Sequence, residues 1–206
     1  MTQWVEWHED YERPERSLSR RLEVVRDRIR RALDAAGASA TILSLCSGDG
    51  RDVIGVLRNN PGSARRAVLV ELDPSLADRA RQSATAVGLT EVEVRCGDAG
   101  SVESFIDVLP VDVLLLCGIF GNIQHGSVKR VIELIPSLVR VGGYAVWTRG
   151  GSDPDRRPEI RAWFVESGLE EVAFDGVPEP YGVGVNQVTG SSGSDQALPE
   201  RLFSFE

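Results

Sequence analysis

Hydrophobic residues near the start of the chain recur at intervals of three and four. They are Leu18, Leu22, Val25, Ile29 and Leu33. This spacing places the apolar side chains on one face of an amphipathic helix, and the glycine that follows at position 37 is a typical stop signal. The pattern predicts that the first regular element is a helix with one face packed against a core.

From residue 41 the pattern changes to short apolar runs, most of them separated by helical stretches. Runs of strand length stand at Thr41–Cys46, Ala67–Val70, Val92–Arg95, Val111–Cys117, Tyr144–Thr148, Val172–Phe174, Val183–Val188 and Leu202–Phe205. Helical stretches stand at Asp52–Arg58, Pro74–Val87, Val128–Val139 and Pro158–Ser167. We expect the pair Gly142-Gly143 to break the chain between the third of these helices and the strand that follows.

Strands that alternate with helices indicate βαβ units and a parallel sheet with helices on both faces. The last runs have no helix between them, so we expect them to pair antiparallel. The prediction is an α/β fold: a three-layer sandwich with a Rossmann-like, mainly parallel sheet, an antiparallel C-terminal edge and an N-terminal helical arm. A length of 206 residues fits a single domain, with residues 1–37 as arm and lid helix and residues 41–206 as the core.

Charge separates this chain from most nucleic-acid-binding proteins. It has 23 Lys and Arg against 31 Asp and Glu, a net charge of −8, whereas binding to phosphates needs a basic surface. The first helix does carry a run of arginines, but Asp27 and Arg31 stand four residues apart, as in a solvated, ion-paired helix face. We therefore do not expect a nucleic-acid partner.

The cysteines Cys46, Cys96 and Cys117 are odd in number and far apart. This spacing gives neither a disulfide framework nor a zinc site, so we expect a reduced, cytoplasmic protein with no metal centre. All three fall at the carboxyl ends of predicted strands, where we interpret them as small buried apolar side chains. The apolar runs are too short to cross a bilayer, so no membrane association is expected.

The residues that could bind a ligand follow the first three predicted strands. Gly48 and Gly50 let the backbone turn sharply and approach a ligand, and Glu71 stands 21 residues beyond Gly50. A carboxylate in that position can accept hydrogen bonds from the hydroxyls of a ribose. Asp98 follows the third strand, where it could accept a hydrogen bond from an adenine amino group.

This ordered series resembles the class I S-adenosylmethionine (SAM) dependent methyltransferases. The matching features are Gly48-x-Gly50 after the first strand, Glu71 at the end of the second, Gly97-Asp98-Ala99 after the third, a hydrophobic fourth strand, and Leu138-Val-Arg-Val-Gly-Gly-Tyr144 before the fifth. The resemblance implies the seven-stranded fold of that family, SAM as cofactor and S-adenosylhomocysteine (SAH) as product. The sequence departs from the family at Ser44, where an acid is common, and at Cys46, where a glycine is common.

The resemblance also implies roles for individual residues. Ser44, Cys46, Gly48 and Gly50 would lie along the methionine and ribose side of the cofactor. Glu71 would hold the ribose, Leu72 would lie against the adenine, and Asp98 and Ala99 would meet its amino edge. Cys117, Gly118 and Phe120 would form the floor below the sulfonium, and Tyr11 of the N-terminal arm would close over it.

Methyl transfer needs alignment of the acceptor and, for a protonated acceptor, a base. The two histidines, His8 and His125, are the candidate bases. We name His125 as the catalytic candidate because it follows the fourth strand, with Asn122 of the same loop as a positioning residue. The expected partner is a small-molecule acceptor, and the protein is expected to be a monomer or a homodimer.

Two alternative functions remain open from the sequence. A nicotinamide-dependent oxidoreductase would share the βαβ arrangement, but Val53 occupies the place of the third glycine in Gly-x-Gly-x-x-Gly. A non-catalytic protein that binds SAM or SAH is the other alternative, and it stays open because of the departures at Ser44 and Cys46.

Overall fold

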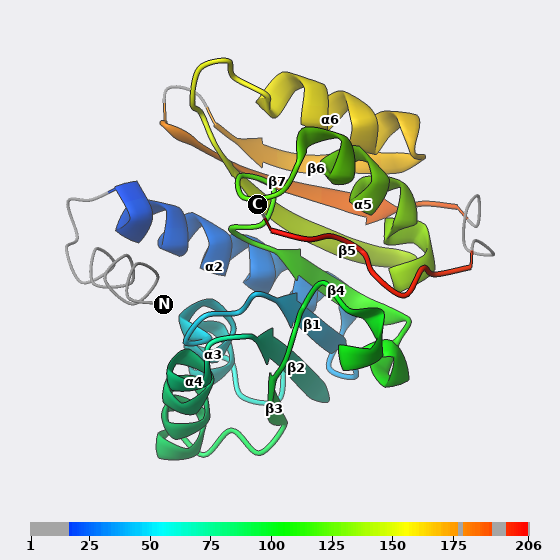
Figure 1. Cartoon of the computed structure of the whole chain (residues 1–206). Coiled ribbons are helices and arrows are strands. Elements are labelled where there is room, and N and C mark those ends of the chain that lie inside the picture. The colour runs from blue at the N-terminus through cyan, green and yellow to red at the C-terminus, as the bar shows by residue number, and fades with distance from the viewer. Residues whose placement is uncertain (1–16, 177–178, 191–196, 206) are drawn as a thin grey trace.

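The computed structural model describes residues 17–176, 179–190 and 197–205, which build one seven-stranded sheet between two layers of helices (Figure 1). In chain order the elements are α2 (Ser17–Ala36), β1 (Thr41–Leu45), α3 (Arg51–Asn59), β2 (Arg66–Glu71), α4 (Pro74–Ala86), β3 (Val92–Cys96), the 3₁₀ turns η2 (Val102–Ser104) and η3 (Ile106–Val108), β4 (Val111–Leu116), α5 (His125–Leu138), β5 (Val139–Gly150), α6 (Arg157–Glu166), β6 (Leu169–Asp175) and β7 (Tyr181–Val188).

The strands lie in the order β3-β2-β1-β4-β5-β7-β6. The first five are parallel, because a helix or a pair of 3₁₀ turns carries the chain back between them, whereas β7 runs antiparallel to both β5 and β6. The predicted α/β sandwich and its antiparallel C-terminal edge are therefore confirmed.

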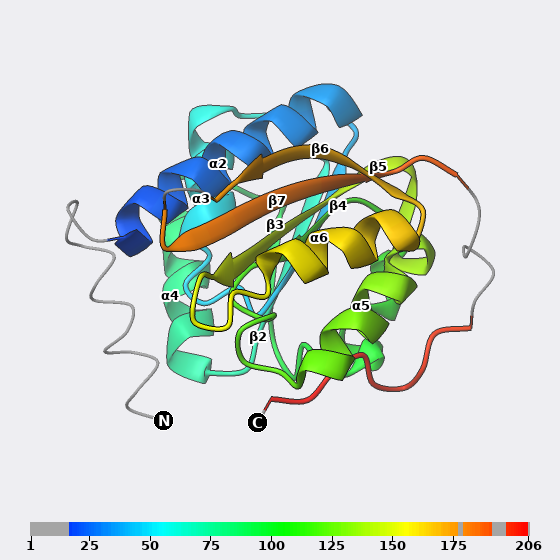
Figure 2. The same cartoon turned by 90° about the horizontal axis from the view of Figure 1, so that it is seen from above.

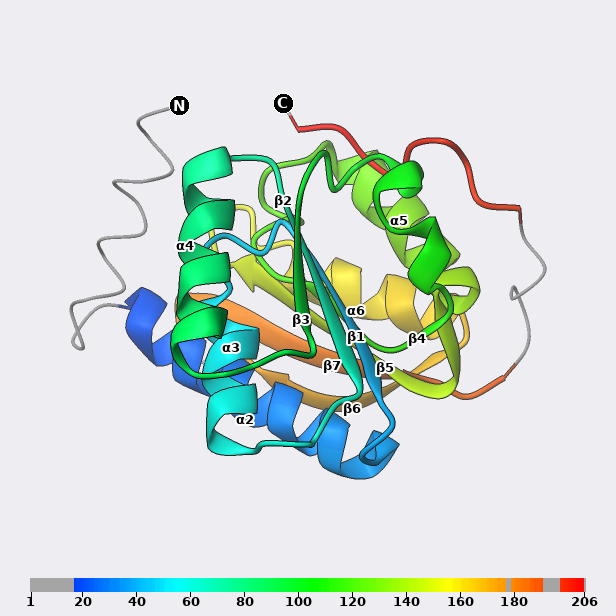
Figure 3. The same ribbon diagram turned by 90° about the horizontal axis from the view of Figure 1, so that it is seen from below.

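Each face of the sheet is covered by its own set of helices, as Figures 2 and 3 show. Helices α2, α3 and α4 pack over one face, where Ile29, Val53 and Ala80 belong to one hydrophobic cluster. Helices α5 and α6 cover the other face, where Trp147 and Phe164 belong to a second cluster. Because side chains alternate along a strand, consecutive strand residues contribute to opposite clusters.

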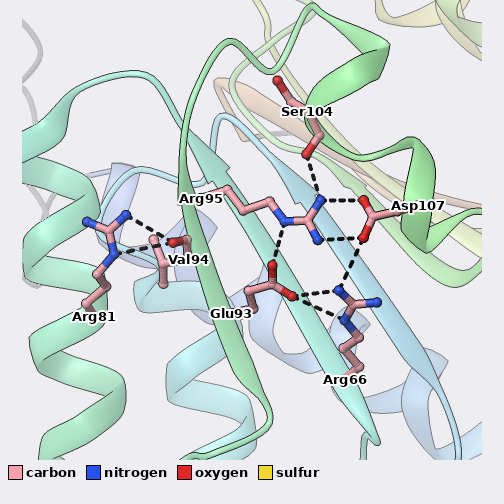
Figure 4. Close-up of polar contacts among 7 residues, drawn as sticks. All are labelled: Arg66, Arg81, Glu93, Val94, Arg95, Ser104 and Asp107. Atoms are coloured by element: carbon pink, nitrogen blue, oxygen red, sulfur yellow. Dashed lines mark hydrogen bonds and ion pairs between the residues drawn. The ribbon is translucent and has the colours of Figure 1, made fainter.

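Strand β3 forms one edge of the sheet, and arginines cover it (Figure 4). Arg81 of α4 donates two hydrogen bonds to the carbonyl oxygen of Val94, at 3.0 and 3.3 Å. Arg95 bridges Glu93 and Asp107, with Nη1 at 2.6 Å from Asp107 Oδ1. Paired charges of this kind hinder another strand from adding to the edge.

The structure corrects three predicted elements. Helix α5 begins at His125, before the predicted start at Val128, and β5 runs through Gly142-Gly143 instead of starting after them. The glycines fit inside the strand because a Cβ on Gly143 would lie 2.7 Å from the carbonyl oxygen of Asp112. The predicted strand Leu202–Phe205 is wrong. Residues 201–205 form only two isolated β-bridges, Ser101 with Arg201 and Ile123 with Phe205.

The arginine run on α2 is ion-paired, as expected. Asp27 pairs with Arg30 and Arg31, and Arg28 reaches Asp175 of β6 at 2.7 Å. Within the described ranges, no helix is both long enough and apolar enough to cross a membrane.

Candidate functional site

The turn after β1 is held in a left-handed backbone conformation at three positions. Cys46, Gly48 and Gly50 have φ values of 56°, 59° and 70°. A Cβ on Gly50 would lie 2.6 Å from Leu69 Cδ2 of β2, so only glycine lets the turn pack this closely onto the sheet. Cys46 is the one non-glycine residue in the described chain with a positive φ.

Glu71 ties this turn to the next strand. Its Oε2 accepts the backbone N–H of Gly48 at 2.8 Å, and its Oε1 accepts the N–H of Asp73 at 2.9 Å. The side chain is largely buried at the carboxyl end of β2. A carboxylate oxygen has two lone pairs, so each oxygen can accept a further hydrogen bond from a ligand hydroxyl.

Two exposed residues flank the Glu71 carboxylate. Leu72 is 65% exposed, which is unusual for a leucine next to a polar site. Cys96, at the end of β3, is also exposed, and its thiol lies 3.8 Å from the carbonyl oxygen of Leu72. The expectation that all three cysteines are buried apolar residues is therefore wrong for Cys96, because β3 is an edge strand.

Asp98 lies where the sequence placed it, after β3, but it has a partner that the sequence did not indicate. Its Oδ2 pairs with Arg201 of the C-terminal segment at 2.8 Å, and its Oδ1 accepts the N–H of Gly100. The next residue, Ala99, is buried in the hydrophobic cluster beneath α5.

A side chain of β5 holds the backbone of the loop that follows β4. The Thr148 hydroxyl accepts the N–H of Gly118 at 2.9 Å, and the side-chain amide of Asn122 donates to the carbonyl oxygen of Gly118 at 2.7 Å. Phe120 is buried beside Trp147, with ring centroids 6.0 Å apart, so it packs within the core below the loop.

His125 occupies the first position of α5 and points toward α6. Its Nε2 lies 2.8 Å from Glu159 Oε2, and its ring lies 4.7 Å from the Trp163 ring. Arg156 contacts the same Glu159 oxygen. Desolvation raises the pKa of that carboxyl, but the hydrogen bonds from His125 and Arg156 together outweigh it, so the pKa is lowered. The structure places His125 in a polar contact between two helices, and its role as a base stays a prediction.

Cys46 and Cys117 flank this edge of the sheet as protonated thiols. Burial raises the pKa of Cys46 well above its usual range, and the carboxylates of Glu71 and Asp98 add to the effect. Burial also raises the pKa of Cys117, with Asp52 as the next cause.

Asp52 is a carboxylate that sequence reasoning missed. It is the second residue of α3, and burial raises its pKa. Its Oδ1 accepts the N–H of Val53, but no ion pair to Asp52 occurs in the described part of the chain. The sequence signal was present, since Asp52 stands two residues after Gly50, but in the sequence Asp52 was interpreted only as the start of a predicted helix.

Tyr11 and His8 lie outside the described residues. Ser44 is buried within β1, opposite Leu69 of β2 and Leu115 of β4. In the described ranges, no group of three or more metal-ligating side chains comes together.

No protein-family model and no curated protein matches the chain. Solved structures match it at a TM-score above 0.6. An O-methyltransferase family protein from Burkholderia thailandensis has a TM-score of 0.67 at 19% identity over 83% of this chain and 56% of its own. The N-methyltransferase NodS from Bradyrhizobium japonicum has a TM-score of 0.64 at 13% identity over 87% of this chain and 99% of its own. A geranyl diphosphate methyltransferase, solved in complex with SAM, has a TM-score of 0.63 at 14% identity over 83% of this chain and 85% of its own.

The fold is that of the class I SAM-dependent methyltransferases. This likeness agrees with the strand order and the antiparallel β7. Within this methyltransferase fold, the ends of β1, β2 and β4 bring Glu71, Cys46, Asp52 and Gly118 to one edge of the sheet. The chain spans only about half the length of the Burkholderia protein.

Proposed function

We propose that the chain is a SAM-dependent methyltransferase that acts on a small-molecule acceptor. The observation that carries the proposal is the Glu71 carboxylate, which two backbone N–H groups fix at the carboxyl edge of the sheet. Ligands of open α/β sheets bind at this edge. The methyltransferase fold and the SAM complex of one structural neighbour support SAM as the ligand.

The residues present suit the chemistry of SAM. Glu71 would accept hydrogen bonds from the ribose hydroxyls, and Leu72 offers exposed apolar surface for the adenine. Asp98 keeps lone pairs for an amino group. SAM also carries an ammonium and a sulfonium, and the partly buried carboxylate of Asp52 would offset positive charge that Ser44 cannot.

Bound SAM supplies an activated methyl group, so the protein has to align the acceptor and exclude water. The loop after β4 borders the proposed methyl position, with Gly118 fixed by Thr148 and Asn122. Asn122 would position the acceptor, and His125 would remove a proton only after leaving Glu159. The organisation of residues 1–206 as one domain, with residues 1–37 as arm and lid helix and Tyr11 over the cofactor, is part of the same proposal.

Titration calorimetry with SAH tests the proposal directly. We expect binding to the wild-type protein and a loss of about tenfold or more in Glu71→Ala, since two or more charged hydrogen bonds are removed. Asp73→Ala is the matched control, because it removes a helix cap worth about 1 kcal/mol one turn away but leaves Glu71 in place. Absence of binding to folded wild-type protein would contradict the proposal.

The two alternatives remain outcomes of the same experiments. Binding of SAH without methyl transfer to a broad acceptor panel would favour a non-catalytic binding protein. Binding of NADH in place of SAH would favour an oxidoreductase. The structure offers one argument against that function, because Val53, at the place of the third glycine of the dinucleotide motif, is buried in the hydrophobic cluster on the α2 face.

A further inference from the structure

Arg149 brings a positive charge to the edge of the sheet where β4 and β5 end. It is the penultimate residue of β5, and it lies two residues after Trp147. Because side chains alternate, Arg149 points to the same face as Trp147, which is buried in the cluster beneath α5 and α6. Thr148, between them, points to the opposite face and fixes Gly118.

The Arg149 guanidinium has no partner in the described part of the chain. Its Nε is buried without a hydrogen-bond partner, and no ion pair or hydrogen bond involves its other nitrogens. Burial lowers the pKa of Arg149, because desolvation disfavours the charged form. An unpartnered, partly buried charge costs stability, and proteins normally pair such groups.

The loop after β4 leaves room for this side chain. A Cβ on Gly121 would lie only 2.8 Å from Arg149 Nη1, so a larger residue there would displace the guanidinium from this position. Gly121 lies between Phe120, which packs on Trp147, and Asn122, which holds Gly118. The guanidinium is thus directed at the loop that borders the proposed methyl position.

The nearest charged groups are occupied by other residues. Asp155, whose charge acts on Arg149, accepts hydrogen bonds from Arg157 on both of its oxygens, at 2.8 to 3.0 Å. Arg156, also near Arg149, pairs with Glu159 at 3.2 Å. In the described ranges no hydrogen bond or ion pair joins Asp155 to Arg149, so the guanidinium can still donate to an anionic ligand.

We propose that Arg149 binds an oxyanion, a carboxylate or a phosphate, of the methyl acceptor, an inference that rests on the proposed methyltransferase function. The planar guanidinium donates parallel hydrogen bonds that match both groups, and its partial burial strengthens such a pair. Arg149 thereby selects anionic acceptors over neutral ones of the same shape.

Thermal melts with oxyanion probes test this inference. Wild-type protein is melted with benzoate, phenyl phosphate, inorganic phosphate or neutral benzamide at constant ionic strength, with and without SAH. We expect at least one oxyanion to raise Tm more than benzamide does. A larger effect of benzoate assigns a carboxylate, and a larger effect of the phosphates assigns a phosphate.

Arg149→Met keeps an unbranched side chain that reaches about as far as Nε, but it removes the guanidinium and its charge. We expect it to abolish the oxyanion effect and to raise Tm without ligand, whereas a merely structural arginine would lower Tm when replaced. Arg149→Lys should retain part of the effect, and it serves if Arg149→Met does not fold. Arg156→Met is the matched control, since it removes a neighbouring charge that already has a partner, and it should respond as wild type.

Equal responses of the wild-type and Arg149→Met proteins to every oxyanion would overturn the inference. SAH binding separates this failure from that of the proposed function. If wild-type protein binds SAH and Arg149 has no effect on oxyanions, only the inference fails. If SAH does not bind, the methyltransferase proposal fails, and with it the assignment of the oxyanion to a methyl acceptor.

Discussion

Two residues between β1 and the first turn of α3 are held in unfavourable states at the candidate site. Cys46 adopts a left-handed conformation that favours glycine, and Asp52 holds a carboxylate where burial raises its pKa. Strained backbone and poorly solvated charge gather at functional sites, because the surrounding structure holds them in place. Both features lead to measurable predictions.

At Cys46 we expect glycine to be better tolerated than alanine. Both substitutions remove the partly buried sulfur, but only glycine relieves the positive φ, so Cys46→Gly should be more stable than Cys46→Ala by about 1 kcal/mol. Urea unfolding of the two variants measures the difference. Equal stability of the two would show that the backbone at this turn is not strained.

At Asp52 we expect a gain of stability together with a loss of binding. A raised pKa means that the folded state favours the protonated form, so stability is full below the unfolded pKa, about 3.9, and is lost as pH rises. Asp52→Asn should therefore melt higher than wild type at pH 7, and the two should converge near pH 4. Calorimetry should show weaker SAH binding for the variant, and unchanged binding would exclude Asp52 from the cofactor site.

At the scale of elements, charged side chains cap the start of a helix and cover the edge of the sheet. Asp73 caps α4 by accepting the N–H groups of Ser75 and Leu76, with Pro74 at the first helical position, as the sequence indicated. Edge strand β3 depends instead on contacts that are distant along the chain, from Arg81, Arg66 and Asp107 (Figure 4). A local motif is readable from the sequence, but the pairing partners of an edge strand are not.

The ion pair between Arg95 and Asp107 at the β3 edge predicts that the stability of the protein depends on pH in the acid range. Hydrogen bonds from Arg95 lower the pKa of Asp107 to about 2, so its contribution is present above about pH 4 and is lost as pH falls toward 2. The Tm difference between wild type and Asp107→Asn should therefore shrink between pH 5 and pH 2. A difference that is independent of pH would show that the ion pair with Arg95 does not contribute in solution.

At the scale of the whole molecule, the C-terminal segment joins parts of the carboxyl edge that lie far apart in the sequence. Figures 1 and 2 show it running past α5 toward the loop after β4. Leu202 donates its N–H to the carbonyl oxygen of Gly100, and its side chain and that of Phe203 are buried in the core. Arg201 adds the ion pair with Asp98. The segment therefore braces the loop that carries Asp98.

Two neighbouring phenylalanines allow a controlled test of this brace. Phe203→Ala should lower the free energy of unfolding by about 3–5 kcal/mol, because Phe203 is only 3% exposed. Phe205→Ala removes the same side chain from a position that is 43% exposed, so its effect should be much smaller. Similar effects of the two variants in urea unfolding would contradict a packed C-terminal segment.

The sequence by itself determined the order of the strands and helices and the acids and glycines that follow the strands. Hydrophobic periodicity, helix capping and turn conformation determine these features, and each depends only on residues that are close in the sequence. The prediction was wrong where a distant partner decides. Gly142-Gly143 lies inside β5 because β4 passes close by, and residues 202–205 pack without forming a strand.

Only the tertiary structure decided which charges have no ion pair within the described ranges. In the sequence, Asp52 is one helix-start acid and Arg149 is one arginine among many. Their burial, and the engagement of nearby charges such as Asp49, Asp155 and Arg156 with other groups, depends on how strands β1, β4 and β5 meet at one edge. Solvation is a property of the folded surroundings, so no local pattern could show that these two groups are available to a ligand.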